Sequence, residues 1–370
     1  MLMEDLREYY YKSPGNPDKI CELITERIID DIHHNTTLNV KSNIHTIVKN
    51  QVSVVAGKIY CGEYRPNTDK IVQELCEELG YNNKNRRFSS EAVRHINLIE
   101  FLDEEKRFPS NNFIKSVGYA SDETPEGLPI GHILAREITN NILKLDSIGF
   151  DVTTYLTVKY QDNYPKEITT INIEYSLNNV EEDPKELLHD CEVLFDGKCD
   201  NYMNLVTSNT QINISCLGLG GPDTQVGSLS GLLMPSSFGG IWLYDFFGKS
   251  HNDLKRMSSL VARAAAKTIS KSSMCNEALI EVSYNNTQTE PASFTAKFNN
   301  IIGDVDFMTS NLQDIFNFNK DEINSNFDGA SLLNNTTTKK EYFGHEYMGQ
   351  DDKDIFPWEK LNKLKEFTPF

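Results

Sequence analysis

The chain has 370 residues, of which 39% are hydrophobic, and this is enough apolar material for a sizeable core shared by two or three modules. Acidic residues number 54 against 36 lysines and arginines, so the net charge is -18, and a chain this acidic repels nucleic acid and anionic lipid. No apolar run approaches the roughly 18 residues that a membrane span needs, and the acidic start MLMEDLREYY is not typical of a signal peptide. We therefore expect neither a nucleic acid nor a membrane as partner.

The cysteines are odd in number and scattered, and they form no C-x-x-C pair. This pattern is typical of reduced thiols and does not indicate a disulfide framework or a zinc site. We expect a cytoplasmic protein.

The first third of the chain alternates between helical and strand-like patterns. Apolar residues at helical spacing predict a helix after Pro17, with Asn16 as its N-cap and Asp18 at the positive end of the helix dipole. The run TIVKNQVSVVAGKIY predicts strand structure, and NTDKIVQELCEELGY predicts a second helix. Residues 82–112 are polar, and we expect them to be mostly irregular with one short helix or strand around Val93–Phe101.

The rest of the chain repeats this alternation. A Gly- and Pro-rich loop, GYASDETPEGLP, precedes a predicted helix from about Pro129, and VTTYLTVKY and EITTINIEYSL predict an antiparallel hairpin closed by the turn QDNYP. PKELLHDCEVLF and LKRMSSLVARAAAKTIS predict further helices, ALIEVSY predicts a strand, and LLNNTTTKKEY predicts an exposed loop. No long linker is visible, so we predict an α+β fold of three similar sheet-plus-helix blocks in one compact body, at 1–104, 105–218 and 219–370.

A glycine-rich stretch at Gly218–Pro222 has two interpretations. Glycines let backbone N–H groups approach an anion, so the stretch fits a phosphate cradle. No Gly-Lys-Ser/Thr follows it, and the third glycine of a dinucleotide fingerprint is missing, so a structural turn is the alternative. No Ser-His-Asp or Cys-His pattern accompanies it.

Taken in chain order, several segments resemble the motifs of the S-adenosylmethionine synthetases (methionine adenosyltransferases). SPGNPDKICELITERIIDDI resembles the family's opening GHPDK helix, GYASDETPEGLP its GYATNET loop, and GGPDTQVGSLSG its GGPxGDxGLTGRK segment. FGG, GKSHNDLKR, VARAAAKTI, EVSYNNTQTEP and FPWEK resemble the C-terminal series. The similarity covers about residues 13–300 and 341–360, and it implies the family's three-block fold.

The resemblance also implies a chemistry. In the family, methionine sulfur attacks C5′ of ATP and expels triphosphate, which the enzyme then hydrolyses, so the site needs Mg²⁺, K⁺ and several basic groups. By the resemblance, Asp18 matches a metal-binding acid, Lys19 its catalytic neighbour, Asp151 an ATP-contacting acid and Lys249 a phosphate-contacting lysine.

Most other matched positions carry a different residue. Asn16 replaces a catalytic His, Gln225 a catalytic Asp, and His45 a potassium-ligating Glu. Further replacements are Pro14 for Glu, Lys58 for Glu, Asn112 for Asp, Thr153 for Lys, Gly231-Leu232 for Arg-Lys, Asp253 for Lys, Lys255 for Asp, and Tyr244, Phe246 and Phe247 for small residues. Each lost contact to a developing anion costs roughly a hundred- to thousandfold in rate, so we expect Mg²⁺ and K⁺ only if the family site still functions.

Three functions follow from this pattern. The favoured one is a catalytically degenerate, non-catalytic or regulatory subunit of a synthetase oligomer. The chain would form this oligomer with copies of itself or with a full-motif synthetase, because family members share active sites between subunits. The alternative is a diverged but active methionine adenosyltransferase that makes S-adenosylmethionine, or an analogue, from ATP and methionine and releases phosphate and diphosphate. A third is a protein that binds ATP, methionine or S-adenosylmethionine without turnover. The strands VSVVAGKI and YLTVKY are the predicted interface, with an internal core as the other interpretation.

Overall fold

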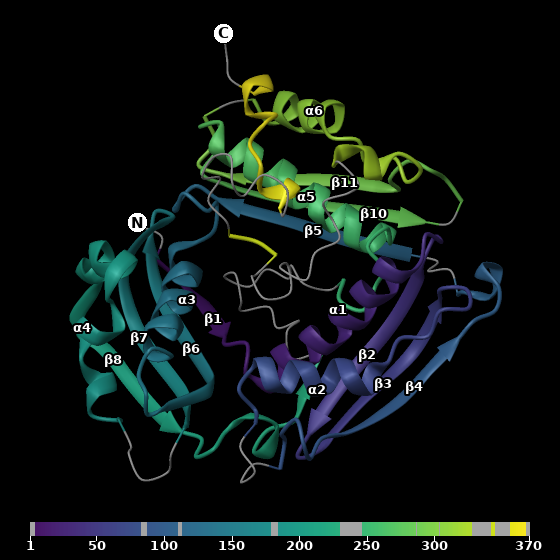
Figure 1. Ribbon diagram of the computed structural model, residues 1–370. Helices are drawn as coiled ribbons and strands as arrows, with labels where there is room; N and C mark the ends of the chain where they lie inside the picture. Colours follow the sequence, from purple (N-terminus) through teal and green to yellow (C-terminus); the bar gives the residue numbers. More distant parts are fainter. Residues whose placement is uncertain are drawn as a thin grey trace.

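The computed structural model describes residues 4–82, 87–109, 113–178, 184–229, 246–285, 287–302, 304–327, 342–344 and 356–367. The strands in these ranges form three separate sheets around the middle of the molecule, and helices pack on each of them (Figure 1). The predicted α+β class and the three sheet-plus-helix units are confirmed. Asn112, Gly231-Leu232, Tyr244 and the predicted loop before Tyr342 lie outside the described residues.

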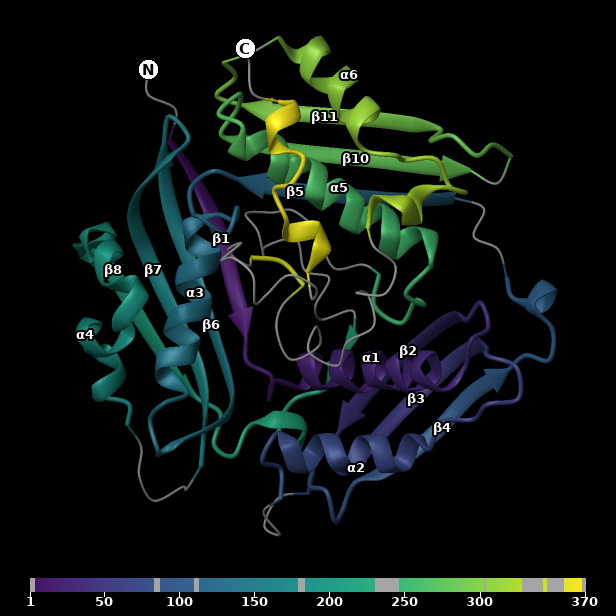
Figure 2. The ribbon, with the colours of Figure 1, turned by 45° about the horizontal axis from the view of Figure 1, so that its top comes forward.

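The N-terminal sheet carries two helices on one face (Figure 2). Its members are β4 (Arg94–Phe101), β3 (Val52–Tyr60), β2 (Lys41–Lys49) and β9 (Gly227–Ser228), covered by α1 (Pro17–Asn35) and α2 (Thr68–Glu78). The predicted start of α1 is confirmed, because the Asp18 backbone N–H donates to Asn16 Oδ1. The run TIVKNQVSVVAGKIY splits into β2 and β3 at a turn where Asn50 has a φ of 50°.

The central sheet contains the predicted hairpin. Its members are β1 (Glu4–Lys12), β6 (Ile148–Gln161), β7 (Tyr164–Leu177) and β8 (Val206–Cys216), with α3 (Ile130–Ile142) and α4 (Cys191–Leu194). Strands β6 and β7 are antiparallel, and their turn has positive φ at Asp162 and Asn163, which these residue types tolerate. The single helix predicted for PKELLHDCEVLF is wrong: a 3₁₀ turn at Leu187–His189 ends at Asp190, whose side chain caps the separate α4.

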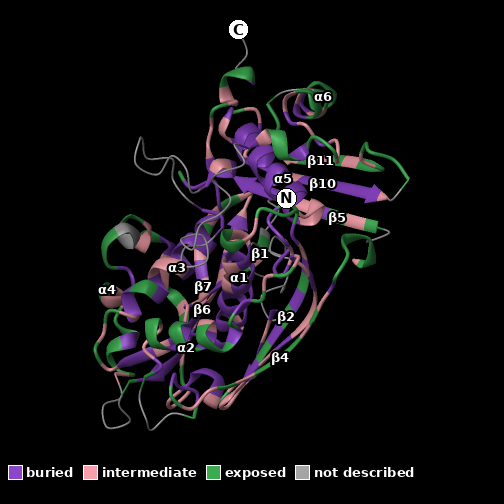
Figure 3. Cartoon of the chain, turned by 45° about the vertical axis from the view of Figure 1, so that its right-hand side comes forward, coloured by how far each residue is buried: buried purple, intermediate pink, exposed green. Residues whose placement is uncertain are grey.

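The C-terminal sheet packs on a helix that is buried along most of its length (Figure 3). Its members are β11 (Ser293–Asn299), β10 (Glu277–Asn285) and β5 (Phe113–Ser121), with α5 (Leu254–Lys271) and α6 (Val305–Ile315). The predicted helix and strand in this third of the chain are confirmed. The other 3₁₀ turns in the described ranges are Glu105–Arg107, Gly197–Leu205, Gly221–Asp223, Ile323–Asn326, Pro357–Glu359 and Leu364–Glu366.

The C-terminal 3₁₀ turn Pro357–Glu359 is fastened to α5 by buried charges. Glu359 accepts hydrogen bonds from Arg263 Nε at 2.9 Å and from Lys267 Nζ at 2.6 Å. Arg263 also donates to the backbone carbonyls of Tyr119 and Gly127, so a single side chain joins α5, β5 and the chain terminus.

The sheets exchange strands along the chain. The first strand, β1, lies in the central sheet, β5 lies in the C-terminal sheet, and β9 returns to the N-terminal sheet beside β2. Each sheet therefore contains strands from more than one of the three contiguous blocks predicted from the sequence. The boundaries of those blocks stay a prediction.

Two hydrophobic cores lie beneath these sheets. One is shared by the N-terminal and C-terminal units, and the other belongs to the central unit. None of the helices in the described ranges has the length and apolar character that a membrane crossing requires.

Candidate functional site

The N-terminus of α1 meets the central sheet at a cluster of polar groups, which we call the N-cap cluster: Lys12, Asn16, Asp18, Asp151 and Gly221. Asn16 is buried and uses both ends of its amide. Its Oδ1 caps the helix, and its Nδ2 donates to Asp151 Oδ1 at 3.0 Å. Asn16 is thus a structural link between α1 and β6.

Asp151 lies at the centre of this cluster and is fully buried. Its Oδ2 accepts the Gly221 backbone N–H at 2.7 Å, and burial raises the pKa of its carboxyl to about 6. Of the two interpretations of the glycine-rich stretch, the hydrogen bond favours the structural turn, because the N–H of Gly221 already donates to a protein carboxylate. A Cβ at Gly221 would also lie 2.5 Å from the Tyr81 hydroxyl.

Asp18 is held by two protein donors. Lys12 Nζ donates to its Oδ2 at 2.5 Å, and the Ser228 backbone N–H donates to its Oδ1 at 2.8 Å. The neighbouring Lys19 is buried in an ion pair with Glu22, with Nζ to Oε2 at 2.6 Å. Two of the predicted catalytic and metal-binding side chains are therefore occupied by partners within the chain.

Lys249 lies in a different part of the molecule. It forms an isolated bridge to Asn43 of β2, and the adjacent Gly248 N–H donates to Glu26 Oε1 on α1 at 3.2 Å. Among the described residues, the Lys249 ammonium has neither an ion-pair nor a hydrogen-bonding partner. Burial lowers its pKa, and Lys255 adds to this effect while Asp253 opposes it.

The two groups of predicted residues do not share one site within the chain. Asp18 and Glu26 are eight residues apart on α1, which corresponds to about 12 Å along the helix axis. Lys249 lies beside the Glu26 end, whereas Asn16, Asp18 and Asp151 lie at the start of the helix. Gln225, which is half-buried, follows Gly221 on the Asp18 side.

Residues that differ from the family motif have structural roles here. Asp253 is the N-cap of α5, where its Oδ1 accepts the Lys255 backbone N–H at 2.8 Å. The Lys255 ammonium donates to the backbone carbonyl of Lys115, and Lys58 pairs with Glu100 at 3.1 Å.

The bulky aromatic residues near Lys249 belong to the core. Phe246 and Phe247 are buried and pack against Tyr342, with ring centroids 5.2 Å and 5.8 Å apart. The Arg256 guanidinium lies over the Phe246 ring and pairs with Glu26. These side chains fill the space between α1 and α5 and hold a buried cation there.

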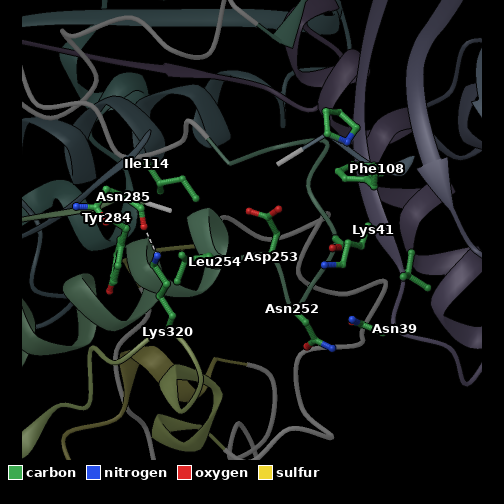
Figure 4. Close-up of a pocket in the computed structure, with 13 residues that line it drawn as sticks. Asn39, Lys41, Phe108, Ile114, Asn252, Asp253, Leu254, Tyr284, Asn285 and Lys320 are labelled. Carbon is green, nitrogen blue, oxygen red and sulfur yellow. Dashed lines mark hydrogen bonds between the residues drawn. The ribbon is translucent and has the colours of Figure 1, made fainter. Parts of the chain in front are cut away.

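A pocket of about 540 Å³ opens between the N-terminal sheet and the start of α5 (Figure 4). Lys41 and Phe108 line one side, and Tyr284 and Lys320 line the other, with Asp253 between them. Lys320 donates to the carbonyl of Asn285, and Lys41 pairs with Glu105. The pocket borders Lys249 through Ser250 and does not include the N-cap cluster.

Most of the chain is similar to known proteins. Residues 11–103, 114–214 and 219–360 match the family profiles described as the N-terminal, central and C-terminal domains of S-adenosylmethionine synthetase. The chain belongs to the S-adenosylmethionine synthetase family. The three profiles follow one another in order and leave only short segments between them, so the resemblance of the motifs is confirmed at the level of the family.

Individual synthetases are distant from this member. The S-adenosylmethionine synthase of Petrotoga mobilis is 27% identical over 95% of each chain, and that of Mesoplasma florum is 26% identical over 95% of this chain and 96% of its own. A solved structure of an unusual S-adenosylmethionine synthetase from Campylobacter jejuni superposes with a TM-score of 0.78 at 21% identity, and covers 98% of this chain and 99% of that one. This last likeness concerns the fold.

One residue of the N-cap cluster was missed by sequence reasoning. Lys12 lies on β1, which the sequence pattern did not predict, and it reaches Asp18 because that strand leads directly into the turn before α1. In the sequence, Lys12 directly precedes SPGNPDKI, and no general spacing rule assigns a role to a lysine at that position.

Proposed function

We propose that this member of the S-adenosylmethionine synthetase family is a catalytically degenerate, non-catalytic or regulatory subunit of a synthetase oligomer. The observation that carries the proposal is that the two lysines at the start of α1 are engaged inside the chain. Lys12 pairs with Asp18 and Lys19 with Glu22, and both pairs are largely buried.

This engagement matters because a departing triphosphate carries several negative charges. Positioned cations stabilise such a group only when they are free to face it, and each missing contact costs roughly a hundred- to thousandfold in rate. Lysines already paired to carboxylates must exchange one partner for another, which reduces the net gain from binding the anion.

The role of a partner subunit is supported by the outer face of the N-terminal sheet. Ile47, Val54 and Ile96 are in register across β2, β3 and β4, on the face opposite α1 and α2. Ile47 is 46% exposed, Ile96 44% and Leu98 59%. An exposed apolar row of this kind on a sheet face is suited to association with another subunit. The separation of Lys249 from Asp18 is also suited to sites completed by a second subunit.

Co-expression with a full-motif synthetase tests the proposal. We expect one mixed complex in size-exclusion chromatography with light scattering, and separate elution of the two proteins would overturn the proposal. The double variant Ile96→Lys/Leu98→Lys is expected to abolish the complex, because it places two charges on the apolar face. Ile301→Lys/Ile302→Lys is the matched control, since Ile301 and Ile302 are 44% and 79% exposed and lie beside the C-terminal sheet, after β11. Equal complex formation by both variants would exclude this face as the interface.

The alternative is a diverged methionine adenosyltransferase, and Lys249 is the observation that favours it. The Lys249 ammonium has no partner among the described residues, and the next residue, Ser250, lines the pocket. We take this ammonium as a candidate contact for an anionic substrate. Incubation of the purified chain with ATP, methionine, Mg²⁺ and K⁺, followed by chromatographic detection of S-adenosylmethionine, tests this function. If the chain makes S-adenosylmethionine and Lys249→Met abolishes this turnover, the result favours a diverged methionine adenosyltransferase over a non-catalytic subunit. Calorimetry with ATP and S-adenosylmethionine tests binding without turnover.

A further inference from the structure

The position of Lys12 is fixed by the register of the central sheet. Lys12 is the last residue of β1 and pairs with Thr153 of β6, which in turn pairs with Glu174 of β7. Residues opposite one another in adjacent strands point to the same face, so Lys12 and Glu174 share that face. Asp18 follows at the start of α1 and lies beside the same end of the sheet.

Lys12 lies in an acidic region of the described structure. Asp18 is its ion-pair partner, Glu174 lies on the same face of the sheet, and the Lys12 charge acts on Asp151 as well as on Asp18. Its ammonium also lies 5.4 Å from the centroid of the Tyr10 ring. The side chains of Lys12 and Asp18 are only 10% and 14% exposed, so the pair is largely shielded from water.

The donor set around Asp18 does not fit a divalent cation. Mg²⁺ requires oxygen ligands in near-octahedral geometry, but both Asp18 oxygens already accept hydrogen bonds, from an ammonium and from a backbone N–H. The residues that the structure describes contain no group of three or more His, Cys, Asp or Glu side chains arranged to hold a metal. A metal at Asp18 would have to displace Lys12 and then lie next to its positive charge.

We propose that the Lys12 ammonium takes the place of a divalent cation at Asp18, so that the N-cap cluster is charge-compensated without metal. The sequence prediction assigned a metal to Asp18, and Lys12 explains why that assignment does not suit this chain. The inference is independent of the proposed subunit role, because metal binding is measured on the full chain whether or not it turns over substrate.

Mn²⁺ binding, followed by electron paramagnetic resonance, tests the inference. The net charge of -18 gives weak background binding, so each result is compared with Asp18→Asn. We expect the wild type and Asp18→Asn to bind Mn²⁺ equally. We expect Lys12→Met to gain a site at least about tenfold tighter than the background, because a neighbouring positive charge is removed. Lys12→Met/Asp18→Asn is expected to lose that site.

Lys12→Arg is the matched control, since it keeps the positive charge and is expected to bind Mn²⁺ as the wild type does. Wild-type binding that Asp18→Asn weakens would overturn the proposal, and this comparison does not require any Lys12 variant to fold. A folded Lys12→Met protein, checked by circular dichroism, that gains no site would also overturn it.

Discussion

Asp151→Asn should make the stability of the protein less dependent on pH. Asp151 is buried, and its carboxyl accepts hydrogen bonds from Asn16 Nδ2 and from the Gly221 N–H. Burial raises its pKa from 3.8 to about 6. A raised pKa in the folded state means that this group stabilises the fold fully below pH 3.8, and that this contribution is lost as the pH rises through about 6.

The size of the effect follows from the two pKa values. The difference between 3.8 and about 6 corresponds to about 3 kcal/mol, at 1.36 kcal/mol per pH unit. An Asn at 151 has one oxygen acceptor and an NH₂ group with two donors, so it keeps one of the two hydrogen bonds that Asp151 accepts and sets its NH₂ against the other donor. We therefore expect the variant to be less stable than the wild type near pH 4. The variant does not bury a charge as the pH rises. Relative to the wild type, its free energy of unfolding should therefore increase by about 3 kcal/mol between pH 4 and pH 8.

Urea and thermal unfolding between pH 4 and pH 8, followed by circular dichroism and calorimetry, measure this difference. The melting temperature of Asp151→Asn should rise relative to the wild type by several degrees across the range. Asp162→Asn, in the exposed turn between β6 and β7, is the control and should follow the wild type at every pH. The reasoning would be refuted if the difference in free energy of unfolding between Asp151→Asn and the wild type stayed constant over this pH range. It would also be refuted if the wild type became more stable relative to the variant as the pH rises.

Two further predictions concern the attachment of α5. Burial raises the pKa of Glu359, but Arg263 and Lys267 outweigh this effect and hold the pKa at about 2. The ionised Glu359 therefore stabilises the fold fully above pH 4.5, and this contribution is lost as the pH falls through about 2. Glu359→Gln should cost about 3–5 kcal/mol at pH 7 in urea unfolding, because it leaves buried cations unpaired, whereas Glu366→Gln, on an exposed residue, should stay within about 0.5 kcal/mol. Gly118→Ala should lower the melting temperature by an amount equivalent to about 1–3 kcal/mol or more, because its Cβ would lie 2.0 Å from the backbone of Ala262. Lys115→Ala, on the other face of β5, should change the melting temperature little, and equal losses in both variants would contradict the packing argument.

Elements with strong local signals were predictable from the sequence. The start of α1 carries an N-cap, a proline and an acid in order, and α5 has a long apolar stripe, so each helix is specified by its own residues. The β6–β7 hairpin was equally clear, because Asp162 and Asn163 suit its tight turn and Ile171 and Ile173 alternate with polar residues. Family membership followed from the order of such segments.

Other parts depend on contacts that are distant in sequence. Strand β1 reads EDLREYYYK, which lacks apolar alternation, and it becomes a strand because it pairs with β6 about 150 residues later. Strand β5 was missed because its glycine and serine residues suggest a loop, although Gly118 is required where α5 packs closely. The partners of Asp18 could not be predicted for the same reason, since Lys12 and Ser228 come from β1 and β9.

The exchange of strands between sheets constrains how the protein is made. Strand β1 is synthesised before its partner β6, and β2 lacks its neighbour β9 until residue 228 has been added. The N-terminal unit therefore cannot complete its sheet during early translation, and its exposed edges must be kept apart from other nascent chains. For the same reason a truncated chain that ends after the N-terminal unit would retain unpaired edges, and attempts to isolate one unit should include the strands that it receives from the others.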